Sequence, residues 1–226
     1  MTIKHRPIIF SSDSVASILD GMKTNTRRVV NFGKKVFTDN EHALWNDVQK
    51  AKDGSYIFWG EKVPENITPE LYKDGGFKCP YGDVGDRLWV RETYAIERVD
   101  GFTQIVWKAD KRAQYIENGF KIGEPFWLVS DYKPRTPWKS PRFMPRWASR
   151  LTLEIVSVDV ERLHGITNAG VRAEGITAHH PPRKKDDLPT SRSAFARHWD
   201  MINKKRGYKW DVNPWVWVVG FKVAES

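Results

Sequence analysis

Residues 18–30 read Ile18-Leu19-Asp20-Gly21-Met22-Lys23-Thr24-Asn25-Thr26-Arg27-Arg28-Val29-Val30. The apolar spacing that leads into this stretch predicts an amphipathic helix over residues 13–20, and Gly21 can take the left-handed conformation that closes a helix. From Thr26 onward, the β-branched residues predict a strand. A helix is therefore followed at once by a strand, and a lysine, two threonines and two arginines lie at the junction.

This junction offers a candidate nucleophile and a candidate base. A threonine hydroxyl is a poor nucleophile unless a base removes its proton, and a lysine can be that base when burial or neighbouring cations destabilise its ammonium. Lys23 and Thr26 lie three residues apart across the expected turn, and Arg27 and Arg28 supply the neighbouring cations. The alternative interpretation is a solvated basic turn without chemistry.

The composition points to polyanionic partners. The 226 residues include 37 Lys plus Arg against 28 Asp plus Glu, a formal net charge of +9 that attracts nucleic acid or nucleotides. Eleven Trp, eleven Phe and seven Tyr can fill a core or stack on bases. The length fits one elaborated domain, so we expect a single domain over residues 1–226.

Other features exclude several classes of protein. A single cysteine, Cys79, excludes an internal disulfide, and we expect its thiol to be structural. The first residues carry no apolar leader and no run reaches the length of a membrane span, so we expect a cytoplasmic protein with no membrane partner. The adjacent His179 and His180 have no second ligand pair, and we expect no metal or other cofactor.

The hydrophobic patterns predict more strands than helices. The apolar positions of residues 151–163 change parity at Ile155 and Val156, which predicts a β-bulge or a strand that moves from one sheet surface to another. Further strands are expected at 3–10, 55–60, 88–93, 103–108 and 213–223, and short helices within 109–119, 169–176 and 193–202. The prediction is an α+β fold built on a small closed β-barrel with flanking short helices and long loop insertions.

A proline-rich segment and one strand face offer binding surfaces. Residues 137–150 interleave prolines with Arg, Lys and Trp, a combination that suits a groove for single-stranded nucleic acid; a rigid loop over the barrel mouth is the alternative. Trp89 and Arg91 share the strand face opposite Leu88 and Val90, where they can form a wall for a planar ligand. Simple packing of Trp89 is the alternative there.

Four blocks of the chain, in this order and spacing, resemble the ASCH superfamily, a branch of the PUA-like barrels. They are residues 21–28, residues 85–92, residues 173–176 and the Trp-Val-Val-Gly-Phe run at 217–221. A longer match adds residues 79–82, 143–150 and 213–215, covers nearly the whole chain, and is similar to larger phage- and prophage-encoded ASCH proteins.

The resemblance implies a six-stranded barrel with flanking helices and a cleft for RNA, modified bases or nucleosides. Some small bacterial members are amidohydrolases that remove the acetyl group from N(4)-acetylcytidine with a lysine, a threonine and a glutamate. Their G-x-K-T-x-T-x-R pattern puts the lysine on Lys23, the threonine on Thr26 and the arginine on Arg28, and their glutamate falls on Glu174. This chain is longer, with insertions at about 31–78, 95–140 and 177–192.

In the enzyme that this resemblance implies, Lys23 takes the proton of Thr26, Thr26 attacks the acyl carbon, and Glu174 protonates the departing amine. Backbone N–H groups of the turn or Arg28 stabilise the oxyanion, and Glu92 is an alternative acid. The residues expected to bind the substrate are Thr24, Arg28, Trp89, Arg91, Glu92, Arg146 and Trp147.

A non-catalytic reader of RNA or modified DNA is the second hypothesis. In that protein Lys23 and Arg28 bind phosphates while aromatic side chains stack on a base, and RNA is the favoured ligand. A third interpretation, a phage protein that inhibits a host factor by mimicking nucleic acid, fits a basic protein poorly.

Overall fold

The computed structural model describes residues 2–31, 47–51, 53–59, 77–118, 120–176 and 191–224. These residues belong to two compact units, each assembled from separate stretches of the chain. The first unit comprises Met1–Met22, Gly85–Glu154 and Lys222–Ser226, and the second comprises Lys23–Val84 and Ile155–Phe221. Most of the insertions predicted at 31–78 and 177–192, with His179 and His180, lie outside the described residues.

In the first unit, strand β1 (His5–Ile9) pairs in parallel with β5 (Arg87–Arg91), and β5 pairs antiparallel with the start of β10 (Thr152–Arg162). β1 has a partner on one side only within this unit, which explains how it accommodates Pro7, a residue without a backbone N–H. Helix α1 (Ser12–Leu19) follows, capped by the Ser11 hydroxyl, and Gly21 has the predicted left-handed φ of 72°.

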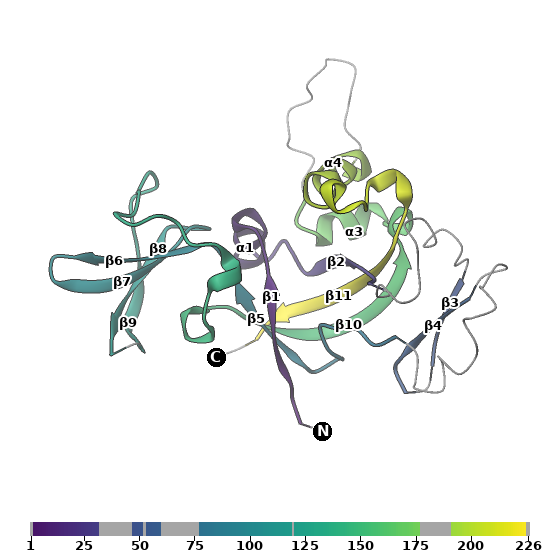
Figure 1. Cartoon of the computed structure of the whole chain (residues 1–226), viewed down its shortest axis with the longest axis horizontal. Coiled ribbons are helices and arrows are strands. Elements are labelled where there is room, and N and C mark those ends of the chain that lie inside the picture. The colour runs from purple at the N-terminus through teal and green to yellow at the C-terminus, as the bar shows by residue number, and fades with distance from the viewer. Residues whose placement is uncertain are drawn as a thin grey trace, which may run out of the picture. The chain divides into compact units, whose positions relative to one another are not determined.

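The first unit also contains an antiparallel sheet, labelled β6 to β9 in Figure 1. Its strands are β6 (Tyr94–Val99), β7 (Phe102–Trp107), β8 (Arg112–Glu117) and β9 (Phe120–Trp127). The short helix predicted within 109–119 is therefore wrong. Lys111 has a φ of 58°, and the Asp110 carboxylate accepts the N–H of Arg112, so the chain turns back and forms a hairpin.

The proline-rich segment packs on this sheet through its small and apolar side chains. It contains two short 3-10 helices, η2 (Pro141–Phe143) and η3 (Arg146–Ala148), because its prolines prevent longer regular structure. Met144 and Ala148 form a buried cluster with Tyr94, Ile105 and Trp107. The segment is thus held by its apolar residues, whereas its Arg142 and Arg146 are exposed.

The second unit has its own sheet and helices. Strand β2 (Asn25–Val29) pairs antiparallel with β11 (Trp215–Val223), whose last two residues belong to the first unit. Figure 1 shows α3 and α4 on the same side of β2 and β11. The remaining elements of this unit are β3 (Asp47–Lys50), β4 (Tyr56–Trp59), most of β10, η4 (Leu163–Gly165), α3 (Asn168–Ala173), α4 (Ser191–Asn203), η5 (Lys204–Arg206) and η6 (Trp210–Val212).

β11 is buried on both faces, as its continuous apolar sequence predicts. Val216 and Val218 belong to the core beneath the helices, together with Val171 of α3 and with Phe195 and Trp199 of α4. On the other face, the rings of Trp215 and Trp217 contact Phe58 and Tyr56 of the β3–β4 hairpin, with centroids 5.5 and 5.2 Å apart. This double burial explains why the buried part of the strand, residues 215–221, contains no charged side chain.

The fold class is confirmed as α+β with strands in the majority, but no closed barrel is found among the described strands. Among the described strands β2 pairs with β11 alone, and just before β2 an isolated bridge joins Lys23 to Glu174. The buried positions of β10 do change parity within one continuous strand, from Leu153 and Ile155 to Val158, but not at Val156 as predicted, because Val156 is 47% exposed.

Candidate active site

The backbone fixes the start of β2 on both sides. The N–H of Thr24 donates to the carbonyl of Ala173, at 2.8 Å, and the carbonyl of Thr24 accepts the N–H of Phe221, also at 2.8 Å. Lys23 is held between the end of α3 and β11 by these bonds and by its bridge to Glu174. The turn after Gly21 therefore presents a lysine at a fixed place in the second unit.

Lys23 and Glu174 form a buried ion pair. The Lys23 Nζ lies 2.6 Å from Oε2 of Glu174 and donates to the Glu174 carbonyl oxygen at 2.9 Å. Their residues are only 5% and 9% exposed. Two of the three predicted catalytic residues, 151 positions apart in the sequence, are thus brought together.

Two further charges complete this site, which we call the lysine cluster: Lys23, Arg27, Glu161 and Glu174. Arg27 lies in β2 and donates from Nη1 to Oε1 of Glu174, at 3.2 Å, and from Nε to Oε1 of Glu161 in β10, at 2.8 Å. Two cations balance two carboxylates, as a buried charge cluster requires.

The local sequence places Glu174 at the end of a short helix. The Thr167 hydroxyl caps α3 by accepting the Gly170 N–H at 3.1 Å, and Gly175, with a φ of 74°, ends it as predicted. A carboxylate at a helix C-terminus is normally unfavourable because the terminal carbonyls carry partial negative charge. The cations of Lys23 and Arg27 offset this repulsion.

Burial lowers the pKa of Lys23 below the ordinary lysine value of 10.5. The charge and hydrogen bond of Glu174 oppose this shift, whereas the nearby charges of Arg28 and Arg27 add to it. A lower pKa brings the free amine, which is the basic form, closer to neutral pH. The environment of Lys23 therefore suits a general base.

Thr26 and the two predicted binding residues beside it lie in the same stretch. Thr26 is 4% exposed and stands opposite Val219 of β11. Because side chains alternate along a strand, Thr26 and Arg28 point to the face of β2 opposite that of Arg27. Thr24 links α3 to β11 through its backbone alone in the bonds described above.

The other predicted binding residues lie in the first unit. Trp89 and Arg91 share one face of β5 as predicted, with the Arg91 guanidinium 5.4 Å from the Trp89 ring centroid. The Arg91 guanidinium also donates to the carbonyl of Arg142. Arg146 and Trp147 lie on the proline-rich segment, where both are exposed.

Glu92 belongs to a second buried site, the arginine cluster, made of Glu92, Asp110 and Arg150. Arg150 donates to both oxygens of Glu92, at 2.9 and 3.1 Å, and to Asp110 at 2.8 Å. The guanidinium lies 4.7 Å from the centroid of the Trp107 ring. Burial raises the pKa of Glu92, although Arg150 opposes the shift.

Three of these charged residues, Glu161, Asp110 and Arg150, were not predicted from the sequence, and Arg27 was expected only as a cation near Lys23. Arg27 carries a local signal, because it lies in a strand in which Thr26 and Arg27 are both buried. A buried cation needs a carboxylate partner. Its partners have no such signal, since Glu161 lies 134 positions away and in another strand.

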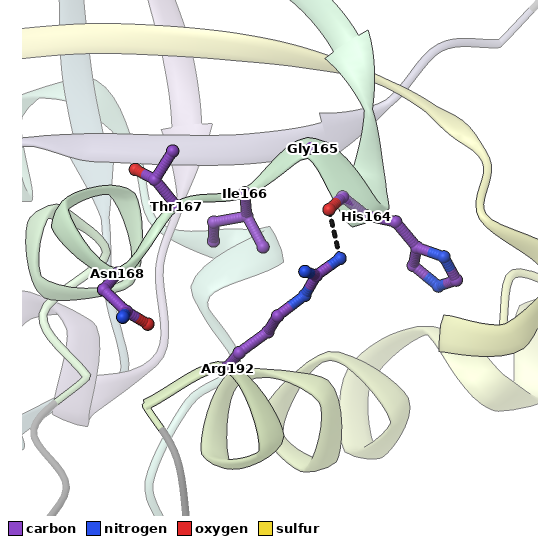
Figure 2. A pocket seen from close by; sticks show the side chains of 6 residues that line it. All are labelled: His164, Gly165, Ile166, Thr167, Asn168 and Arg192. Atoms are coloured by element: carbon purple, nitrogen blue, oxygen red, sulfur yellow. Dashed lines mark hydrogen bonds between the residues drawn. The ribbon is translucent and has the colours of Figure 1, made fainter.

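The second unit also has a pocket of about 490 Å³, lined by His164, Gly165, Ile166, Thr167, Asn168 and Arg192. Figure 2 shows the Arg192 side chain reaching from α4 toward the other lining residues, where it donates to the carbonyl of His164. None of the predicted site residues lines this pocket. No residue of the lysine cluster lines this pocket either.

No group of three or more His, Cys, Asp or Glu side chains among the described residues is arranged to hold a metal ion. None of the helices in the same part of the chain is both long enough and apolar enough to cross a membrane.

Comparisons with known proteins gave structural neighbours but no family. No family model matches the chain, and no curated protein matches it. The chain is similar to the crystal structure of protein EF3133 from Enterococcus faecalis V583, of the family DUF984, with 9% identity and a TM-score of 0.39 over 99% of this chain and 77% of that one.

A second similar structure is an ASCH domain from Lactobacillus crispatus JV V101, with 12% identity and a TM-score of 0.37 over 97% of this chain and 79% of that one. The structural neighbours thus include a member of the superfamily that the sequence resembles. At TM-scores of this size, neither likeness supports an argument about activity or substrate.

Proposed function

We propose that this protein is an amidohydrolase that removes an acyl group from the exocyclic amine of a modified nucleobase, with N(4)-acetylcytidine as the model substrate. The single observation that supports it best is the buried contact of 2.6 Å between Lys23 and Glu174. A lysine whose pKa is lowered by burial can accept a proton, and the adjacent carboxylate can pass that proton on.

The reaction proceeds in two steps. Lys23 accepts the proton of the Thr26 hydroxyl while the Thr26 oxygen forms a bond to the acyl carbon. The bond between the acyl carbon and the exocyclic nitrogen then breaks. The proton moves from Lys23 through Glu174 to the departing amine. Water then attacks the acyl-threonine ester, which releases the carboxylic acid and restores the Thr26 hydroxyl.

This mechanism requires a hydrogen bond between the Thr26 hydroxyl and Lys23 Nζ in the substrate complex. In the free protein Thr26 points to the face of β2 opposite that of Arg27, which meets Glu174, so the mechanism requires this contact to form when the substrate binds. Arg28 shares the face of Thr26 and is the nearest cation in sequence that can stabilise the oxyanion on that face.

The test is the hydrolysis of N(4)-acetylcytidine to cytidine, followed by the change in ultraviolet absorbance. Wild-type protein and Thr26→Ser should turn the substrate over, whereas Thr26→Ala should be inactive, because only the first two carry a hydroxyl at position 26. No turnover by the wild type, or equal turnover by Thr26→Ala, would overturn the proposal.

The second candidate function is a non-catalytic reader of RNA, and a specific surface favours it. The proline-rich segment exposes Arg142, Phe143, Arg146 and Trp147, with Phe143 at 72% and Trp147 at 37% exposure, on a chain of net charge +9. Cations beside exposed aromatic rings are the arrangement that binds single strands.

A reader should bind single-stranded RNA with an affinity that falls steeply as salt increases. The Arg142→Ala and Arg146→Ala variants should weaken this binding, and Glu174→Ala should leave it intact because Glu174 is 9% exposed and in the other unit. Fluorescence anisotropy at several salt concentrations measures this. RNA binding whose affinity does not depend on salt would contradict this second candidate function.

A further inference from the structure

Arg27 lies between the two carboxylates of the lysine cluster, and it is not among the four residues that the resemblance matched: Lys23, Thr26, Arg28 and Glu174. Its side chain is 5% exposed, and its separate nitrogens donate to Glu174 at 3.2 Å and to Glu161 at 2.8 Å. Of the Glu174 carboxylate, Oε1 accepts from Arg27 and Oε2 accepts from Lys23. Each oxygen of this carboxylate is therefore bound by a different cation, and the two cations together fix its orientation.

The fold provides space for this guanidinium. A Cβ atom at Gly170 of α3 would come 3.0 Å from Nη2 of Arg27 and 3.2 Å from Cγ1 of Ile166. Glycine at position 170 thus lets the arginine lie against the helix that ends at Glu174. Glu161, with a side chain 33% exposed, holds the other edge of the guanidinium.

We propose that Arg27 is a positioning residue of the lysine cluster: anchored by Glu161, it holds Oε1 of Glu174 so that Oε2 faces Lys23. The inference rests on the proposed function, because it assigns a task within that site. Arg27 contacts no reacting atom; it acts through Glu174.

The same contacts connect Arg27 to the protonation of Lys23. The charged groups that face Lys23 are Glu174 at the end of α3 and Arg27 and Arg28 in β2, while Glu161 of β10 faces Arg27. The Arg27 charge contributes to the lowering of the Lys23 pKa. Without it, Glu174 pairs with Lys23 alone, and the pKa of Lys23 should rise.

The first variant is Arg27→Met, which removes the charge and keeps an unbranched side chain. Its kcat should fall roughly a hundredfold, the cost of misplacing a catalytic group by about 1 Å. The alkaline-rising limb of its pH profile should move to higher pH, because the Arg27 charge no longer lowers the pKa of Lys23. The control is Arg172→Met, which removes an exposed cation from α3 and should change neither quantity.

Two more variants separate charge from position. Arg27→Lys keeps the charge but cannot hold both carboxylates as a guanidinium does. The alkaline-rising limb of its pH profile should therefore stay near that of the wild type, while its kcat falls. Gly170→Ala keeps every charge and displaces the guanidinium. It should lower kcat less than Arg27→Met does, and the alkaline-rising limb of its pH profile should stay where it is in the wild type. Both variants retain the net charge of the cluster and test the inference even if Arg27→Met does not fold.

A second readout does not depend on turnover. The pKa of the Lys23 amine is measured by NMR in protein with isotope-labelled lysine, and it should be higher in Arg27→Met than in wild type. If the wild type does not hydrolyse N(4)-acetylcytidine, the proposed function fails, and this measurement still decides the role of Arg27. An unchanged Lys23 pKa in folded Arg27→Met, or an unchanged kcat in Arg27→Lys and Gly170→Ala, overturns the inference.

Discussion

The lysine cluster of the second unit and the arginine cluster of the first are both buried networks of cations and carboxylates, but they differ in the cation at the centre. Arg150 carries a guanidinium that donates to Glu92 and Asp110 and retains its proton. Lys23 carries an amine whose pKa burial lowers. The central cation of the lysine cluster therefore gives up its proton more readily than the central cation of the arginine cluster.

The arginine cluster connects three segments of the first unit. Glu92 follows β5, Asp110 lies in the turn between β7 and β8, and Arg150 ends the proline-rich segment. Glu92 is 1% exposed, and its two oxygens both accept from Arg150. We therefore expect this cluster to act on stability, and the lysine cluster to act on reactivity.

The largest expected effect on stability is that of Arg150→Met. This variant leaves the Glu92 carboxylate buried without its cation, so the free energy of unfolding should fall by about 3–5 kcal/mol. Urea denaturation measures it. The control is Arg112→Met, which removes a looser, half-exposed partner of the same Asp110 at 3.7 Å and should cost less than about 1 kcal/mol. Equal losses in both variants would show that the arginine cluster is not a stabilising network.

A smaller effect on stability is expected for Lys23→Met. Glu174 keeps its contact with Arg27, and the removal of a costly buried ammonium compensates for the lost pair, so the loss should be less than about 2 kcal/mol. Its hydrolysis rate should nevertheless fall about 10²–10⁴-fold, the contribution of a general base. If Lys23→Met destabilised the protein as much as Arg150→Met and left the hydrolysis rate unchanged, the lysine cluster would act on stability and not on reactivity.

The two clusters should also respond to pH in opposite ranges. The Lys23 pKa is lowered, so between that value and 10.5 the unfolded chain binds more protons, and stability should rise with pH by at most about 1.4 kcal/mol per unit. The Glu92 pKa is raised, so just above 4.5 the folded chain binds more protons, and stability should fall as pH rises.

Denaturation curves across pH test these two slopes, with Lys23→Met and Glu92→Gln as the variants that lack each group. The difference between wild type and Lys23→Met should change only in the alkaline range, and the difference between wild type and Glu92→Gln only in the acid range. A difference that is flat in its expected range contradicts the corresponding pKa direction.

The smallest expected effect concerns the cap of the helix that ends at Glu174. Thr167→Ala removes the oxygen that accepts the Gly170 N–H, and should cost about 1 kcal/mol. Thr167→Ser keeps the oxygen and should retain most of the stability. The measurement is thermal unfolding by circular dichroism. A loss in Thr167→Ser equal to that in Thr167→Ala would mean that the methyl group, not the cap, is responsible.

Local elements were largely predictable because their signals lie within a few residues. The helix before Gly21, the strand after it, the doubly buried β11 and the short helix closed by Gly175 all match their sequence patterns. The helix predicted within 109–119 failed because the hairpin turn at Lys111 depends on a positive φ that a lysine rarely adopts. The predicted barrel closure failed because it depends on pairing between distant strands, and among the described strands β2 pairs with β11 alone.

Within the site, the sequence by itself determined the candidate groups: a lysine after a closing glycine, a threonine and two arginines in the strand that follows, and a glutamate at a short helix end. Only the tertiary structure decided which of them meet, pairing Lys23 with a carboxylate 151 positions away and Arg27 with one 134 positions away. The physical reason is that burial makes a charge depend on its partners, and contacts between distant strands and helices, which no local pattern encodes, decide those partners.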